Sequence, residues 1–554
     1  MIIYYIIKFK KAKLISYKKT KMSILIDEQG RPIILFQDQE NKKRTKGLDA
    51  YKANILAARG VASALKSSMG PKGMDKMLVS PDGDVLVTND GATIVDKMDI
   101  EHPIAKLMVE LSKSQDDEIG DGTTGVVVFA GALLESALHL IEKGIHPIAI
   151  SEGYDKACEK VLANLDDIHT KLDIENTDNL INGAITTLGS KVVSKCQKSM
   201  AMVCVDAIHS VIDKERNDVN FDLIKIQGKV GGSIEDTHLV QGIVLDKEMS
   251  HPQMEKEILD AKICILSCPF EPPKPKTKYN VDIKSAEDYK KLYEHEQAYF
   301  KEMVQQVKDS GANLVVCQWG FDDEANHLLM SHKLPAIRWV GGQELELIAL
   351  ASGGRIIPRF SEIKSEKLGR ARVVKESSYG TENSKLIVIE DCQINKAVTI
   401  VIRGGSETIV DEAHRCIHDA LCVVRNMIKD PRIVYGGGAS EISGSLVLNA
   451  YADSISTVEQ YAIRGFADAL EQIPVCLAEN SGYSGIEYVA NLKAQQAKES
   501  NPYLGVNCLR KETNNMKLQN VYEGLKAKKQ QIQLANQVVK MILKIDDVIE
   551  DHSY

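Results

Sequence analysis

The chain carries the sequence Gly120-Asp121-Gly122-Thr123-Thr124-Gly125 directly before a stretch of helical periodicity at 126–141. A glycine-rich loop at the start of a helix can hold phosphate groups through its backbone N–H groups and the positive end of the helix. The hydroxyls of Thr123 and Thr124 add donors, whereas the carboxylate of Asp121 would repel a bare phosphate and therefore indicates a bridging Mg²⁺. The alternative for this loop alone is a tight turn with a helix N-cap.

Three other glycine-bearing loops lie at the ends of predicted elements. Residues 70–76 (Gly-Pro-Lys-Gly-Met-Asp-Lys) follow a helical pattern at 47–66, and Asn89-Asp90-Gly91 follows a predicted hairpin with its turn at Asp82-Gly83. Gly436-Gly437-Gly438 precedes an amphipathic helix and permits close approach of the backbone to a ligand. Each is weak by itself, because an Asn-Asp-Gly triplet is usually a plain turn and a glycine run is often a hinge.

Bulk composition excludes several classes of protein. The 554 residues, 44% of them hydrophobic, exceed what one core sustains, so we expect roughly two to four domains. The net charge of -8 is spread along the chain without a sustained basic patch, which argues against a nucleic-acid partner. The sequence contains neither Gly-x-x-x-x-Gly-Lys-Ser/Thr nor the protein-kinase His-Arg-Asp set, so any ATPase here must be built differently.

Cysteines and the N-terminus point to a cytoplasmic protein. The 11 cysteines are scattered, as expected for reduced thiols. Cys264 with Cys268, and Cys416 with Cys422, could begin a metal site, but ordinary buried cysteine is favoured because no companion ligands follow. Residues 1–21 are apolar and then lysine-rich, and the apolar stretch is too short to span a bilayer. They are interpreted as a disordered extension, and the alternative is an overextended gene model. No other stretch approaches a transmembrane length, so we expect no membrane partner.

The middle of the chain differs from both ends. Apolar strands at 261–266, 313–317 and 336–340 alternate with amphipathic helices and predict an α/β domain. The proline-rich stretch 269–278 predicts an exposed loop, and a charged helix at 286–308 follows it. Because both ends are mainly helical, we expect one domain built from the two termini, with a different domain inserted at the far end.

Five motifs in a fixed order resemble the group II chaperonins. They lie at 70–77, 88–93, 120–124, 419–421 and 436–438, and the resemblance runs from about Met22 to Val548. Segments 112–118, 269–276 and 318–327 are similar to one subunit type of the eukaryotic cytosolic chaperonin.

The resemblance implies a multidomain α/β and α fold. It comprises a mostly helical equatorial domain, a small α/β intermediate domain, and an α/β apical domain with a helical protrusion. The implied divisions are 1–21 (disordered extension), 22–174 and 431–554 (equatorial), 175–242 and 393–430 (intermediate), and 243–392 (apical, client-binding, with the lid protrusion).

The same resemblance assigns roles in binding and hydrolysing ATP with Mg²⁺. Asp121 would ligate Mg²⁺, while Asp90 and Asp419 would orient and deprotonate the attacking water. Because these two aspartates belong to different domains, hydrolysis should require domain closure. Asn507 stands where the family commonly has aspartate. The implied nucleotide-binding residues are Gly70, Pro71, Gly91, Gly122, Thr123, Thr124, Gly125, Ser190, Lys191, Gly437, Gly438, Asn507, Glu523 and Lys528.

Client contact is expected from the apical domain. Leu345, Ile348, Ala349 and Ser352 fall on one face of a predicted helix and, with the loop at 269–278, resemble the family's client-binding surfaces. The alternative is that this face packs in the core, since an apolar helical stripe is usually core.

The resemblance also implies partners: other chaperonin subunits in a hetero-oligomeric double ring, and partly folded clients such as actin and tubulin. The leading hypothesis is an ATPase subunit whose hydrolysis drives ring closure. The alternatives are a nucleotide-binding ring scaffold that contributes mainly client recognition and assembly, and a metabolic kinase.

Overall fold

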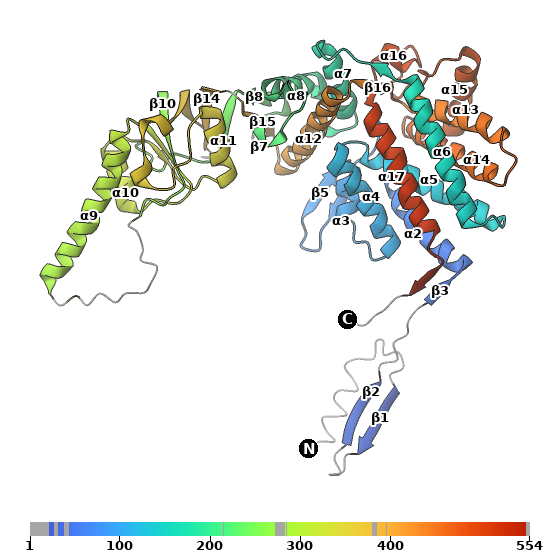
Figure 1. The fold of residues 1–554 in the computed structure, drawn as a ribbon, viewed down its shortest axis with the longest axis horizontal. Coiled ribbons are helices and arrows are strands. Elements are labelled where there is room, and N and C mark those ends of the chain that lie inside the picture. The colour runs from blue at the N-terminus through green and yellow to red at the C-terminus, as the bar shows by residue number, and fades with distance from the viewer. Residues whose placement is uncertain are drawn as a thin grey trace.

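The computed structural model describes residues 21–26, 32–37, 44–213, 215–271, 283, 285–378, 385–394 and 396–549. Apart from Lys21, the predicted extension at 1–21 lies outside these ranges, as do residues 272–278 of the proline-rich loop. Figure 1 shows three bodies in a row: a helical body, a smaller central one, and an outer α/β body from which a long helix projects. The three largest hydrophobic cores correspond to these bodies.

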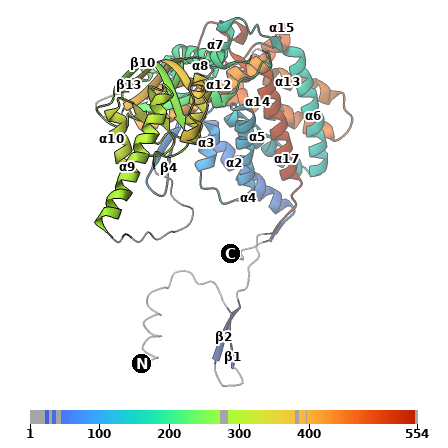
Figure 2. The same ribbon diagram turned by 60° about the vertical axis from the view of Figure 1, so that its left-hand side comes forward.

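The helical body is built from both ends of the chain. Its central helix, α5, packs against helices from the first and last parts of the sequence, as the turned view in Figure 2 also shows. Phe466 of the last part makes edge contacts with the rings of Phe129 and Tyr154, at centroid distances of 5.4 and 5.6 Å. Its helices are α2 (Leu48–Lys66), α3 (Gly91–Lys97), α4 (Pro103–Ile119), α5 (Thr123–Glu142), α6 (Pro147–Ile168), α13 (Ala439–Asp453), α14 (Glu459–Asn480), α15 (Gly485–Glu499), α16 (Met516–Gln519) and α17 (Leu525–Leu543).

Two sequence expectations for this body need correction. From the sequence, apolar periodicity predicts a helix over 104–113. Helix α4 continues beyond this range to Ile119, because a polar run covers its exposed side while Gln115 and Ile119 are buried. Helix α5 is long and apolar enough to cross a membrane, contrary to the expectation that no such stretch exists, but 72% of its apolar window is buried inside the protein. It is accordingly the central core helix of this body.

Short sheets join distant parts of the helical body. The predicted hairpin is present, with Met77 opposite Val87 and the turn at Asp82-Gly83. Strand β16 lies between β17 and β6, and β3 pairs with β18. The strands of this body are β3 (Arg44–Lys46), β4 (Lys76–Val79), β5 (Val85–Thr88), β6 (Thr170–Lys171), β16 (Arg432–Tyr435), β17 (Tyr522–Gly524) and β18 (Asp547–Ile549). Strands β1 (Lys21–Ile26) and β2 (Pro32–Gln37) form a separate two-stranded sheet that lies apart from this body in Figure 1.

The central body packs helices on a three-stranded sheet of order β7-β15-β8. Strand β15 runs parallel to β7, with Ile400 opposite Ile226. The most amphipathic helix, α12, buries its apolar face here against α7 and α8. The elements are α7 (Thr177–Leu188), η1 (Val192–Cys196), α8 (Gln197–Val211), η2 (Phe221–Leu223), β7 (Ile224–Val230), η3 (Ile234–Asp236), β8 (His238–Val240), β15 (Val398–Gly404) and α12 (Glu407–Lys429).

The outer body contains a six-stranded sheet of order β12-β11-β10-β13-β14-β9. The expected strands and the charged helix are present, and the first half of α9 is exposed where it projects from the body (Figure 1). The elements are β9 (Gly242–Leu245), β10 (Glu257–Leu266), α9 (Ala286–Asp309), β11 (Leu314–Cys317), α10 (Asp323–Ser331), β12 (Ala336–Ile337), α11 (Gly342–Ser352), η4 (Phe360–Glu362), η5 (Ser365–Lys367), β13 (Gly369–Ser378) and β14 (Lys385–Cys392).

Candidate functional site

A cavity of about 330 Å³ lies where the helical and central bodies meet, within the size range of roughly 300–1,000 Å³ that is usual for small-molecule sites. It gathers most of the residues predicted from the sequence, although they come from widely separated parts of the chain. Those lining it are Gly70, Pro71, Asp90, Gly91, Asp121, Gly122, Thr123, Thr124, Gly125, Ser190, Lys191, Asp419, Gly437, Gly438, Glu523 and Lys528.

Two of the glycine loops are pressed together at the start of α5. Gly122 is the N-cap of this helix, with a left-handed φ of 76°, a conformation that favours glycine. A Cβ on Gly91 would come within 2.6 Å of the Thr124 hydroxyl and 2.7 Å of its backbone nitrogen. That approach leaves no room for a side chain, so position 91 requires glycine. The first N–H groups of α3 donate to Asp90, and the N-terminus of α5 can donate N–H groups to an anion in the cavity.

Asp90 is held rigidly between these two helices. It caps α3 by accepting from the Thr93 backbone N–H at 2.9 Å, and it accepts the hydroxyls of Thr93 at 2.6 Å and Thr123 at 3.2 Å. Burial alone would raise the pKa of Asp90, but the charge of Lys191 and these hydrogen bonds outweigh it, so the pKa lies below its ordinary value. Asp90 is therefore a fixed anion at neutral pH.

Asp121 is an anion without adequate compensation. Its carboxylate accepts from the Gly122 N–H at 2.7 Å. Burial, followed by the charge of Asp419, raises the pKa of Asp121 to about 6, although Lys191 opposes the shift. Nearby, the side-chain oxygens of Gln115 and Asn89 are buried without a protein partner. A poorly compensated carboxylate, together with amide oxygens that lack a protein partner, suits a hard cation such as Mg²⁺.

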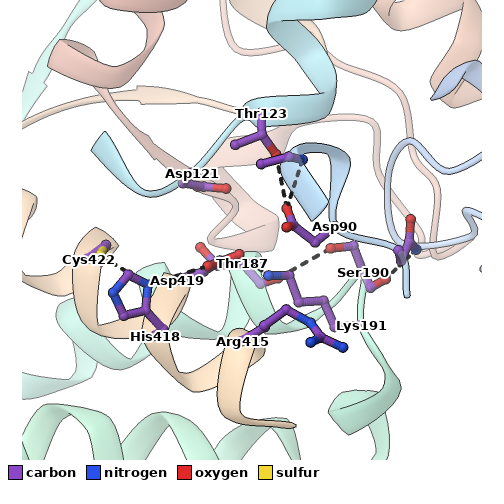
Figure 3. Close-up of polar contacts among 12 residues, drawn as sticks. Asp90, Asp121, Thr123, Thr187, Ser190, Lys191, Arg415, His418, Asp419 and Cys422 are labelled. Carbon is purple, nitrogen blue, oxygen red and sulfur yellow. Dashed lines mark hydrogen bonds and ion pairs between the residues drawn. The ribbon is translucent and has the colours of Figure 1, made fainter. Parts of the chain in front are cut away.

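Lys191, which lies between α7 and η1, forms an ion pair with Asp419 of α12, so both partners belong to the central body (Figure 3). The side chains are only 9% and 14% exposed. Burial would lower the pKa of Lys191, but Asp419 and Asp90 outweigh it and hold the pKa above its ordinary value. In Figure 3, Asp90, Asp121 and Asp419 lie around the same space. The structure thus brings together the carboxylates that the sequence placed far apart.

Two titratable residues beside Asp419 were missed from the sequence. The His418 Nδ1 lies 3.9 Å from a carboxylate oxygen of Asp419, and hydrogen bonding to Asp419 and Cys422 raises the pKa of His418 to about 10. Burial and the charges of Asp90 and Asp419 raise the pKa of Asp116 to about 6. Asp116 lies in the segment 112–118 that carries part of the resemblance, but no sequence signal placed either residue at the cavity, because only the packing of α12 on α4 reveals their surroundings.

The opposite side of the cavity combines a buried charge triad with apolar residues. Lys528 contacts Glu441 at 2.6 Å and Glu523 at 2.7 Å. Burial and the neighbouring Glu441 raise the pKa of Glu523, although Lys528 opposes the shift. Glu441 was not predicted, although an acidic residue in the first turn after the glycine triplet was a readable signal. Apolar lining comes from Ile473, Leu477, Val506 and Met516.

Comparison with known proteins decides the family. The sequence model of the TCP-1/cpn60 chaperonin family matches residues 61–553. The chain belongs to this chaperonin family. It is 49% identical over 530 residues to "T-complex protein 1 subunit epsilon" of Encephalitozoon cuniculi, covering 95% of this chain and 99% of that protein. It is 41% identical over 520 residues to "Thermosome subunit" of Methanocaldococcus jannaschii, covering 94% of this chain and 95% of that protein.

The predicted chaperonin fold class and the resemblance to the epsilon subunit type are thereby confirmed. Membership of the chaperonin family supports a chaperone function, in a nucleotide-dependent family whose members are ATPases, and implies assembly into a ring. The domain boundaries and the individual roles of the site residues stay predictions.

Asn507 is the predicted nucleotide-binding residue that this structure does not place on the cavity wall, and its contact with nucleotide stays a prediction. Asn507 does not line the cavity, although Val506 and Cys508 on either side of it do. Its side chain instead closes a local loop by hydrogen bonding to both the backbone N–H and the carbonyl of Lys511. The amide therefore acts within its own loop, where the family's aspartate was expected to face the nucleotide.

The predicted client-binding face is also corrected. Leu345, Ile348 and Ser352 are 1% exposed or less, and Ala349 is partly buried against the same outer core. This stripe holds α11 on the sheet, which was the alternative considered from the sequence. Burying an apolar face stabilises the folded protein because it removes apolar surface from water. The solvent-facing side of α11 instead presents Gln343, Glu346 and Leu350.

Among the described residues, no group of three or more His, Cys, Asp or Glu side chains could hold a metal alone. The cysteine pairs considered from the sequence are free thiols, and Cys264, Cys416 and Cys422 are buried. A Mg²⁺ ion at Asp121 would therefore need ligands from a phosphate and water as well, which is its usual habit in nucleotide sites.

Proposed function

We propose that this chaperonin subunit binds ATP with Mg²⁺ and hydrolyses it, and that hydrolysis drives closure of a double-ring chamber. The observation that carries the proposal is the convergence of Asp90, Asp121, Asp419 and Lys191 on one cavity, beside the N-terminus of α5. Helix N-termini suit phosphate groups, and the poorly compensated carboxylate of Asp121 suits a cation.

Each residue of the proposed ATP site then has a physical role. The loops at Gly70, Gly91 and 122–125 bind the phosphates, and Asp121 holds Mg²⁺, which when bound supplies charge neutralisation at the phosphates. Asp90, a fixed anion, orients the attacking water. Asp419 accepts the proton of this water. Asp90 is less suited to that role because it already caps α3, whereas Asp419 is held by its ion pair with Lys191.

Lys191 connects binding to turnover. In this structure it forms an ion pair with Asp419. A terminal phosphate arriving in the cavity would compete with Asp419 for the ammonium group, since both are anions within reach of one flexible side chain. We propose that this exchange registers the terminal phosphate.

Asp419 reaches the cavity from α12 of the central core, whereas Asp90 and Asp121 belong to the helical core. Hydrolysis therefore depends on how α12 sits against α4, and closure and chemistry are coupled. We propose that the other subunits of a hetero-oligomeric double ring are the partners, that clients include actin and tubulin, and that the protein acts in the cytoplasm. The similarity to an epsilon subunit supports these assignments.

The test is Asp419→Asn in an assembled particle whose other sites are inactivated. The control is Asp411→Asn, the same change at an exposed position of the same helix. We expect steady-state ATP hydrolysis to fall by about 100-fold or more with Asp419→Asn, as for loss of a general base, with nucleotide affinity retained. Unchanged turnover would favour the ring-scaffold alternative, and phosphate transfer to an acceptor other than water would favour a kinase.

A further inference from the structure

One face of α12 docks on the segment that leads into the Asp121 loop. Asp419, Cys422 and Asn426 recur at helical spacing, so they share one face over roughly two turns. At one end of this face, Asp419 enters the cavity, and at the other, Asn426 also reaches its wall. The face therefore spans from the catalytic carboxylate to a point of contact with the helical core.

Two contacts fix the docking. The Asn426 side-chain amide donates to the carbonyl of Ile119 at 2.8 Å, one of the carbonyls at the end of α4 that have no partner within the helix. One turn earlier, Cys422 packs on Gly120, where a Cβ would come within 2.5 Å of the sulfur. Gly120 also has a left-handed φ of 74°. Both the backbone conformation and the contact with α12 thus require glycine there.

These contacts act directly on the candidate cation site. Ile119 and Gly120 immediately precede Asp121. The Asn426–Ile119 hydrogen bond therefore lies two residues from Asp121 and fixes the position of Asp121 relative to α12. The Gln115 amide reinforces the loop by donating to the Asp121 carbonyl at 3.0 Å. A rigid helix therefore carries Asp419, and a short, braced loop carries Asp121, with Asn426 joining the two.

We propose that Asn426 is a positioning residue that latches α12 to the end of α4, and so sets the separation of Asp419 from Asp121 during hydrolysis. The inference rests on the proposed ATPase function and deepens it. The structure shows this latch closed. The proposal predicts that bound nucleotide holds the latch in this arrangement, and that the particle without nucleotide opens it for part of the time and so exposes Cys422 to solvent.

Cys422 is a native reporter of the latch. In the assembled particle, alkylation by iodoacetamide is followed by peptide mass spectrometry, with and without ADP and aluminium fluoride. We expect the complex to slow alkylation of Cys422 at least tenfold in the wild type and to give little protection in Asn426→Ala. Cys196, which is partly exposed, and Cys416, which is fully buried, supply the fast and slow references within the same chain.

The matched control is Asn536→Ala. Asn536 donates to Asp155 at 3.0 Å wholly within the helical core, so its loss removes a similar hydrogen bond away from α12. We expect this control to retain the protection of Cys422 and the turnover number. If Asn426→Ala also retains both, the latch is refuted.

Kinetics separate positioning from general destabilisation. Asn426→Ala should lower kcat at least tenfold with KM changed less than twofold, because phosphate and nucleoside contacts remain. Asn426→Asp keeps the volume but sets an anion against the Ile119 carbonyl, so it should be worse than Ala. An Asp variant that matches the wild type would show that only packing matters, and overturn the proposal.

The outcomes distinguish the two proposals. A wild-type particle that hydrolyses ATP without protecting Cys422 would refute the latch and leave the ATPase function standing. A wild-type particle that does not hydrolyse ATP would refute the proposed function, and the latch with it.

Discussion

Replacement of Asp121 with Asn should stabilise the nucleotide-free protein while abolishing its activity. The carboxylate is partly buried beside Asp419 and Glu523, and burial followed by the charge of Asp419 raises its pKa from 3.8 to about 6. Asn keeps the shape and a hydrogen-bonding oxygen for the Gly122 N–H, but it removes the charge. The wild-type Asp121 would thus serve the activity of the protein at a cost to the stability of its fold.

The pKa sets both the sign and the size of the effect. Because the pKa is higher in the folded chain than in the unfolded one, ionisation at neutral pH destabilises the folded state. The shift of roughly two units corresponds to about 3 kcal/mol at 1.36 kcal/mol per unit. This cost accumulates between pH 3.8 and about pH 6 and is constant above that range. It is an upper limit, since solvent and ions reach the cavity.

The assay is thermal unfolding of the assembled particle, without nucleotide and with EDTA present. At about 2–4 °C per kcal/mol for a domain of roughly 200 residues, Asp121→Asn should raise the melting temperature by several degrees at pH 7.5 and by less at pH 5. ATP with Mg²⁺ should then stabilise the wild type more than the variant, because the cation site is lost. Turnover should fall to background.

A melting temperature equal to or below that of the wild type at pH 7.5 would refute the reasoning. It would mean that the Asp121 carboxylate is already compensated in the nucleotide-free protein. Asp411→Asn, an exposed change on α12, is the control and should shift the melting temperature by less than about 1 °C, as expected for a surface substitution.

Three further changes test other parts of the structure. Lys191→Met should lower turnover and cost about 3–5 kcal/mol of stability, because removing one partner of a largely buried ion pair leaves Asp419 uncompensated. Unchanged thermal melts and unchanged turnover together would show that Lys191 has no such role. Asp90→Ser keeps an N-cap for α3 but removes the anion, so turnover should fall by about 100-fold with stability reduced by less than about 1 kcal/mol; unfolding of the variant would indicate that Asp90 matters mainly as a cap. Phe466→Ala should cost about 3–5 kcal/mol, because the ring is fully buried against Phe129 and Tyr154, and a loss below about 1 kcal/mol in denaturant unfolding would contradict that packing.

Local sequence signals placed most elements correctly. The periodicity at 47–66 became α2, and Asp82-Gly83 became the turn of the β4–β5 hairpin. Such features depend on residues close together in the chain, so their physics is present in the sequence. The glycine loops likewise marked the N-termini of α3, α5 and α13, because glycine and small polar residues favour those backbone conformations.

The sequence alone therefore determined which segments fold as helices, strands and phosphate-type loops, together with the chemical types available to a site. Only the tertiary structure decided which face of α11 is buried, that Asn507 turns to Lys511, and that His418, Asp116 and Glu441 stand beside the predicted carboxylates. Burial and charge coupling depend on neighbours hundreds of residues away, as with Asn426 and Ile119. No local pattern encodes such a contact, because it exists only once two separate cores have packed together.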